Sequence, residues 1–254
     1  MTGYLAGPGP RAFAHRGWHI GDLAGCENTM AAFARAVDEG YRYLETDVHV
    51  TADGALVAFH DFRLDRVTDS RGRLQDLTWD QVRSARIGGR EPIPLLSEVL
   101  ERFPDTRFNI DPKSDRAVEP LIELLRSAGA ADRVGLGSFS DRRLATLRSA
   151  LGPSVATSLG PQAVGRLAGG ARLGLTPGTG AAVAAQVPVR FGLIPVVTGG
   201  FVRAAHRAGI EVHVWTVDDA AEMHRLLDLG VDGIMTDRPD TLRDVLTSRG
   251  QWAA

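Results

Sequence analysis

The stretch Ala-Phe-Ala-His-Arg-Gly occupies residues 12–17. Its apolar first half predicts a buried β-strand, which runs directly into a histidine, an arginine and a single glycine. An open, doubly wound α/β sheet that binds a dinucleotide carries a glycine-rich fingerprint at this first turn, and the stretch lacks that fingerprint. The stretch therefore favours a closed (β/α)8 TIM barrel over an open sheet with the same alternation of elements.

Short β-branched or aromatic runs alternate with helical patterns along the rest of the chain, which indicates an α/β protein built from parallel βα units. The strands predicted most clearly are 12–15, 43–50, 56–60, 107–111, 134–139, 211–215 and 233–236. Between them lie helices with one apolar face, such as residues 118–125. Eight units in 254 residues would average about 32 residues each, which suits a barrel of typically ~250 residues.

Two stretches depart from this alternation. Residues 62–94 are polar and rich in turns, with a capping-box candidate at Thr78–Gln81, and they predict a small insertion that follows the second strand region and could cover a site. Residues 163–187 are rich in alanine and glycine, so the strand expected there is poorly defined. No linker divides the chain, and we expect one domain over residues 1–254.

Composition excludes several classes of protein. Hydrophobic residues make up 44% and charged residues 24%, which is typical of a folded globular chain. A net charge of -2 without a basic block argues against nucleic acid as a partner. We expect no membrane span, no secretory signal and a cytoplasmic location, and the single Cys26 requires no oxidising compartment. The oligomeric state stays open.

Acidic side chains alternate on the strand predicted at 43–50. Glu45, Asp47 and His49 fall on one face by the two-residue period, and that face points into a barrel. Asp111 ends another predicted strand and would reach the same mouth. Neighbouring buried carboxylates repel each other unless a cation lies between them, which predicts one hard divalent cation, Mg²⁺ or Ca²⁺. The alternative is an ordinary network of ion pairs with buried arginine or lysine.

The charges nearby suggest the ligand. Three carboxylates, one divalent cation and a phosphodiester sum to -2, and Arg16 with Lys113 would bring the total to zero. His15 and His60 each follow a short apolar strand segment, so we expect both at the strand ends where barrel active sites form. Two imidazoles can divide general base and general acid roles in a displacement at phosphorus.

Other polar residues have simpler interpretations. His19, His206 and His224 are expected at the surface, while His49 and His213 face inward by parity. Asn28 or Thr29 precedes a helical run and is predicted to be a helix N-cap. The dipeptide at 53–54, Asp-Gly, predicts a hairpin turn between two strands.

The order of these motifs resembles the glycerophosphodiester phosphodiesterase family of TIM-barrel enzymes, and the resemblance covers nearly the whole chain. The motifs that carry it are His15-Arg16-Gly17, Glu27-Asn28-Thr29, Glu45-Thr46-Asp47-Val48, Thr51-Ala52-Asp53-Gly54, His60-Asp61, Leu64-Asp65-Arg66-Val67-Thr68, Asp111-Pro112-Lys113, Ser138-Phe139, Trp215-Thr216-Val217 and Gly233-Ile234-Met235-Thr236-Asp237-Arg238-Pro239.

The resemblance implies a role for each matching residue. His15 and His60 match the catalytic acid and base, and Glu45 and Asp47 match metal-binding carboxylates. Asp111 stands where many members have glutamate, so the identity of the metal is in doubt. The remaining matches are Arg16 and Lys113, as phosphate contacts, and Trp215, which would line the substrate pocket.

The implied activity is metal-dependent hydrolysis of a glycerophosphodiester, such as glycerophosphocholine or glycerophosphoethanolamine, to glycerol 3-phosphate and an alcohol. Three alternatives remain. They are phospholipase D-like action on lysophospholipids, a barrel that binds phosphodiesters without catalysis, and a metal-assisted aldolase or enolising barrel. Water or the glycerol 2-hydroxyl could be the nucleophile.

Overall fold

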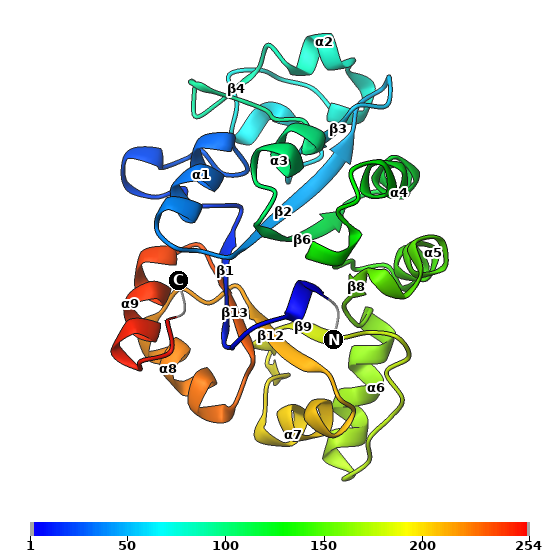
Figure 1. Ribbon diagram of the computed structural model, residues 1–254, viewed down its shortest axis with the longest axis vertical. Helices are drawn as coiled ribbons and strands as arrows, with labels where there is room; N and C mark the ends of the chain where they lie inside the picture. The colour runs from blue at the N-terminus through cyan, green and yellow to red at the C-terminus, as the bar shows by residue number, and fades with distance from the viewer. Residues whose placement is uncertain (1–2, 253–254) are drawn as a thin grey trace.

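The computed structural model describes residues 3–252, which form a ring of parallel strands surrounded by helices (Figure 1). Eight parallel strands lie in the order β8-β7-β6-β2-β1-β13-β12-β9. A parallel bridge between Ser158 and Ala184 connects the two outermost strands, so the ring is nearly closed. This arrangement is the predicted (β/α)8 barrel.

The barrel strands are short and most of their residues are buried. They are β1 (Arg11–His15), β2 (Tyr43–Val50), β6 (Arg107–Pro112), β7 (Val134–Leu136), β8 (Ala156–Thr157), β9 (Ala184–Pro188), β12 (Glu211–Trp215) and β13 (Gly233–Thr236). Parallel strands covered by helices on one side and by lumen contacts on the other are expected to be apolar almost throughout. β2 departs from this rule because Glu45, Thr46, Asp47 and His49 are buried in it.

Each barrel strand is followed by a helix that covers the outside of the barrel. These helices are α1 (Met30–Asp38), α3 (Leu96–Arg102), α4 (Val118–Ser127), α5 (Asp141–Leu151), α6 (Pro161–Arg172), α7 (Gly199–Arg207), α8 (Ala220–Leu229) and α9 (Pro239–Ser248), and after β2 the covering helix is α3. In α4 the buried residues are Val118, Leu121, Ile122 and Leu125, which is the apolar face predicted from the spacing. The apolar faces of the helices form one large core against the outside of the barrel.

Two features of the strand order differ from the prediction. The strand predicted at 56–60 is β3 (Leu56–Ala58), and it pairs antiparallel with β2 outside the ring. The predicted Asp53-Gly54 hairpin turn causes this, because a tight turn returns the chain along the strand it has just left. β8 was not predicted, because two residues carry no readable periodicity.

Residues 62–94 form a small subdomain beyond the end of β2 and β3, at the top of Figure 1. The subdomain contains the 3-10 turns Leu64–Arg66 and Leu74–Asp76, the helix α2 (Trp79–Val82) and a two-stranded ribbon of β4 (Arg86–Ile87) with β5 (Glu91–Pro92). The predicted capping contact is present, since Thr78 N donates to Gln81 Oε1 at 2.9 Å. A separate apolar cluster, which includes Phe59, Leu64 and Ile87, holds the subdomain against β3.

The amino end of the barrel is plugged by the N-terminal segment, seen inside the ring in Figure 1. The 3-10 turn Gly3–Leu5 places Tyr4 in the lumen, where its ring is 2% exposed. Tyr4 donates to Asn109 Oδ1 at 3.3 Å and its carbonyl accepts from Tyr43 Oη at 2.7 Å. A Cβ at Gly135 would lie 2.4 Å from Tyr4 Cζ, so only glycine leaves space for the ring.

The close contact between Gly135 and Tyr4 gives a stability prediction. Gly135→Ala should lower the free energy of unfolding by about 1–3 kcal/mol, the usual cost of overpacking a closed core. Urea denaturation followed by circular dichroism measures the effect. Gly165→Ala is the control, because Gly165 lies in α6 with no atom within 4 Å of the new Cβ. That substitution should raise stability by about 0.5–1 kcal/mol, and equal losses in the two variants would contradict the proposed clash.

Candidate active site

Three neighbouring strands bring His15 and the predicted acidic residues to the carboxyl end of the barrel. His15 ends β1 and lies in register with Glu45 of β2. Asp47, two residues further along β2, lies in register with Asp111 of β6. The acidic side chains therefore occupy one rim of the lumen, as parallel strands require of residues near their carboxyl ends.

Two residues with left-handed backbone conformations shape the turns around this rim. Arg16 has a φ of 57° and Asn28 has the same value, which is uncommon for residues other than glycine. Arg16 N donates to the Glu45 side chain at 3.2 Å, and Asn28 N donates to the Arg16 carbonyl at 2.9 Å. The Asn28 side chain accepts from Thr46 Oγ1 at 2.7 Å.

Asn28 is therefore part of the rim, whereas the N-cap of α1 is Thr29, whose hydroxyl accepts from Ala32 N at 3.2 Å. The sequence offered both residues for the cap, and only Thr29 takes that position. No local pattern signals the left-handed turn that places Asn28 beside the site.

The buried carboxylates of β2 have opposite pKa shifts. Burial raises the pKa of Glu45 to about 7, and the charge of Asp47 adds to the rise. Burial would also raise the pKa of Asp47, but the charges of Lys113 and Arg16 outweigh it and hold that pKa below its usual value. The two acids thus differ because the cations lie beside Asp47, with Lys113 Nζ 2.6 Å and Arg16 Nε 3.3 Å from its oxygens.

Lys113 also binds the third carboxylate. Its ammonium group is 2.8 Å from Asp111 Oδ2, while the other oxygen, Asp111 Oδ1, is buried without a hydrogen-bond partner. Burial raises the pKa of Asp111 despite the lysine. In this arrangement no three His, Cys, Asp or Glu side chains among residues 3–252 are grouped as a metal site. The donors nevertheless fit a hard divalent cation, because three carboxylates share one rim and one of their oxygens is unsatisfied.

His15 is held by a carboxylate that the sequence analysis did not single out. Its Nδ1 lies 2.6 Å from Asp237 Oδ1, in the turn after β13, and its Nε2 lies 3.7 Å from Glu45 Oε2. Burial lowers the pKa of His15, but Glu45 and Asp237 outweigh burial, so the pKa is raised. His19 was expected at the surface and this was wrong, because its side chain is 16% exposed and its Nε2 contacts Asp237 at 3.1 Å.

His60 has an equivalent partner. Its Nδ1 lies 2.6 Å from Asp61 Oδ1, and its carbonyl oxygen lies 3.0 Å from His49 Nε2. Phe59 N donates to the Asp47 carbonyl at 2.9 Å, which keeps His60 beside the rim although β3 is not a barrel strand. The expectation that His60 ends a barrel strand was therefore wrong.

Arg66 of the subdomain connects His60 to the rest of the site. Its guanidinium bonds Asp61 at 2.6 Å and Glu27 at 2.7 Å, and Glu27 also accepts from Arg16 at 2.9 Å. Burial would raise the pKa of Asp61, but hydrogen bonds from Arg66 and His60 bring it to about 2. Local sequence patterns predict no role for Glu27, Asp61 or Arg66. Only their presence in the motifs shared with the family pointed to them.

Trp215 ends β12 on the far side of His15 from Glu45, and Phe139 packs edge-on against it with ring centroids 5.6 Å apart. Both rings stand on segments at the carboxyl ends of strands, so they line the same mouth as the charged residues. His213, two residues earlier, is fully buried and contacts Glu211 at 2.9 Å, which makes it part of the barrel interior.

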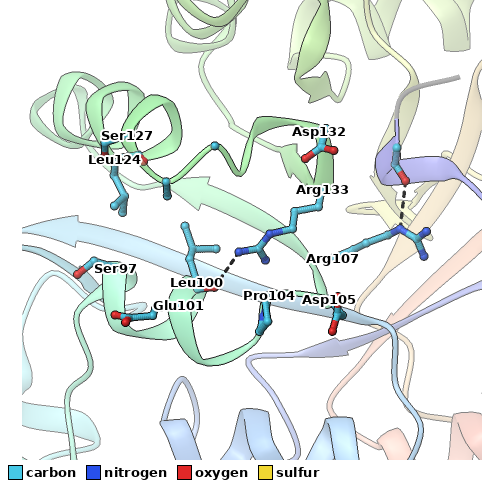
Figure 2. Close-up of a pocket in the computed structure, with 13 residues that line it drawn as sticks. Ser97, Leu100, Glu101, Pro104, Asp105, Arg107, Leu124, Ser127, Asp132 and Arg133 are labelled. Atoms are coloured by element: carbon cyan, nitrogen blue, oxygen red, sulfur yellow. Dashed lines mark hydrogen bonds between the residues drawn. The ribbon is translucent and has the colours of Figure 1, made fainter.

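A cavity of about 780 Å³ lies at the opposite, amino end of the barrel, between α3 and α4 (Figure 2). The two arginines that line it already donate hydrogen bonds to the backbone. Arg133 donates to the Leu100 carbonyl at 2.7 Å, and Arg107 donates to the Gly3 carbonyl at 3.2 Å. None of the predicted site residues lines this cavity. The polar chemistry therefore lies at the carboxyl end, where barrel active sites form.

Comparison with known proteins agrees with this geometry. A model of the glycerophosphoryl diester phosphodiesterase family matches residues 15–241. The chain is 42% identical to the "Probable glycerophosphodiester phosphodiesterase 2" of Mycobacterium tuberculosis, with 98% of this chain and 95% of that protein covered. It is 32% identical to the glycerophosphodiester phosphodiesterase of Caldanaerobacter subterraneus subsp. tengcongensis, with 91% and 97% covered.

Among solved structures, the putative glycerophosphoryl diester phosphodiesterase of Silicibacter pomeroyi has a TM-score of 0.81 at 23% identity, over 98% of this chain and 99% of that one. The fold and the charged rim define a TIM-barrel hydrolase of phosphate esters. The chain belongs to the glycerophosphoryl diester phosphodiesterase family and is an enzyme of that activity.

The contact between Asp237 and His15 predicts a measurable titration. Asp237→Asn removes a charge and an acceptor that favour the imidazolium, so the pKa of His15 should fall. Imidazole resonances followed by NMR between acid and alkaline pH measure the change. Asp240→Asn is the control, because Asp240 bonds Arg238 and not His15. An unchanged His15 titration in Asp237→Asn would show that Asp237 does not raise the pKa of His15.

Proposed function

We propose that the enzyme hydrolyses glycerophosphodiesters such as glycerophosphocholine or glycerophosphoethanolamine to glycerol 3-phosphate and an alcohol, in a metal-dependent reaction with paired histidines. The observation that carries the proposal is the matched environment of His15 and His60. Each imidazole has its Nδ1 2.6 Å from a carboxylate, which fixes the ring and leaves Nε2 for proton transfer. Both histidines lie beside the same acidic rim.

The chain's own residues divide the reaction as follows. One imidazole accepts a proton from the attacking oxygen, and the other donates a proton to the departing alkoxide. Arg16 and Lys113 supply the positive charge that neutralises the phosphoryl oxygens as negative charge builds on them. Trp215, packed against Phe139, forms an apolar wall for the substrate.

Glu45, Asp47 and Asp111 would hold the divalent cation. Bound there, Mg²⁺ or Ca²⁺ would orient the phosphate and act as a Lewis acid. The raised pKa values of Glu45 and Asp111 support this assignment, because burial disfavours both charged forms and the neighbouring cations do not fully offset it. One oxygen of Asp111 has no hydrogen-bond partner and is available as a ligand.

The histidine mechanism predicts a large loss of activity in His60→Ala. Turnover of glycerophosphocholine, measured by release of glycerol 3-phosphate, should fall by about 10²–10⁴, the usual contribution of a general acid or base. His206→Ala is the control, because His206 is half-exposed and bonds Asp232 away from the rim. Full turnover by His60→Ala would exclude the paired-histidine mechanism. A strong preference for long-chain lysophosphatidylcholine would show that lysophospholipids, rather than glycerophosphodiesters, are the substrates.

The metal assignment predicts binding that can be seen without turnover. Titration with Ca²⁺ or Mg²⁺ should raise the melting temperature, because a ligand at 100 times its dissociation constant stabilises by about 2.7 kcal/mol. Chelator should abolish both the shift and hydrolysis. Asp111→Asn should need a higher metal concentration for the same shift, whereas Asp132→Asn, in the cavity at the amino end, should behave as the unchanged protein. Identical titrations of the two variants would exclude Asp111 as a ligand.

A further inference from the structure

Large apolar side chains are exposed mainly at one end of the described molecule. Those that are more than half exposed are Phe62, Phe139, Leu173, Leu175, Phe191, Leu193 and Ile194. All but Leu173 and Leu175 stand on segments that follow β3, β7 or β9, on the side of the barrel where the charged rim lies. Apolar side chains that gather at one place on a surface usually mark an interaction site.

The most exposed group lies on one hairpin. β10 (Arg190–Phe191) pairs antiparallel with β11 (Ile194–Pro195), and nothing else pairs with this ribbon among the described residues. Phe191 is 77% exposed and Leu193 is 91% exposed, so the tip of the ribbon has almost no packing contacts. A two-stranded ribbon of this length is marginal in water without a partner.

The position of the hairpin places it at the mouth of the barrel. Pro188, the last residue of β9, lies in register with Trp215 at the end of β12. The hairpin begins two residues later, so its apolar tip extends from the rim beside Trp215, which in turn contacts Phe139. Phe139 and Phe191 therefore lie on segments adjoining the same tryptophan.

Basic residues accompany this apolar group. The segments 113–117, 137–143 and 189–198 follow β6, β7 and β9, and together they contain five basic residues against Asp115 and Asp141. Arg142 and Arg143 pair with Asp115, whereas Arg190 stands on the hairpin itself. Arg190 precedes Phe191 directly and donates to the Leu193 carbonyl within the same hairpin. Aromatic and aliphatic tips flanked by arginine are the composition of segments that lie in the interface of an anionic membrane.

We propose that the hairpin 190–195, together with Phe139, docks the mouth of the barrel on the surface of an anionic phospholipid bilayer. The tip would enter the boundary between headgroups and acyl chains, and Arg190 would face the phosphates. This surface role is additional to the proposed hydrolysis and does not depend on it. None of the described helices is both long and apolar enough to cross a bilayer, and interfacial docking requires none.

A bilayer fits these features better than a second copy of the chain. A stable protein interface buries about 800 Å² on each partner over a closely packed face. The exposed apolar residues here stand on separate segments around a charged mouth, and the hairpin carries only a narrow tip. A fluid surface accepts such a tip without a complementary shape.

Sedimentation with vesicles tests the proposal. Vesicles of equal phosphatidylglycerol and phosphatidylcholine should retain the protein. Phe191→Ser/Leu193→Ser should lower the partition constant at least about tenfold, since the variant loses both apolar side chains that would leave water. Arg190→Gln should lower binding to these vesicles about fivefold, as expected for one basic residue near an anionic surface. The same change should have little effect on pure phosphatidylcholine vesicles.

The matched control is Leu173→Ser/Leu175→Ser, which removes exposed apolar residues from the connection between α6 and β9. That variant should bind vesicles as the unchanged protein does, and both double variants should keep hydrolysing soluble glycerophosphocholine. Equal binding by the two double variants, or no vesicle binding by the unchanged protein, would overturn the proposal. So would a dimer in solution that the hairpin variant loses while vesicle binding stays absent.

Discussion

Repulsion between Glu45 and Asp47 is the constraint on which the arrangement of the site depends. Both carboxylates project from β2 toward the lumen, and both are almost fully buried. Neither could stay charged there without cations close by. Three basic residues bring positive charge to this end of the barrel. Arg16 is placed by its left-handed turn, Lys113 pairs with Asp47, and Arg66 pairs with Glu27. The raised pKa of Glu45 reflects burial together with the repulsion that these cations leave uncompensated, and the proposed divalent cation would relieve that repulsion.

The small subdomain contributes Arg66 to the site. Arg66 reaches from its first 3-10 turn to Asp61 and Glu27, and these two acids contact His60 and Arg16 respectively. A residue outside the barrel thereby fixes groups on two sides of the rim. The histidines are thus oriented by acids from different parts of the chain, Asp61 beside the subdomain and Asp237 after the last barrel strand.

Local patterns allowed much of this architecture to be predicted. The alternation in 43–50 placed Glu45 and Asp47 on one face, and strand ends placed His15 at the mouth, because both arguments depend only on neighbours in sequence. His19 and Asp237 could not be paired in this way, since 218 residues separate them and only the closing of the barrel brings them together. β8 is too short for periodicity, and the antiparallel return of β3 depends on one turn. The resemblance of the motifs supplied the roles that local patterns could not.

The tyrosine plug at the amino end of the barrel has a consequence for synthesis of the chain. Asn109, the hydrogen-bond partner of Tyr4, lies 105 residues further along the chain, and Gly135, which gives space to its ring, is made later still. The amino end of the barrel can therefore close only after synthesis has passed Gly135. Until then Tyr4 has no lumen to enter, so the turn at Gly3–Leu5 depends on late, long-range contacts rather than on its own neighbours.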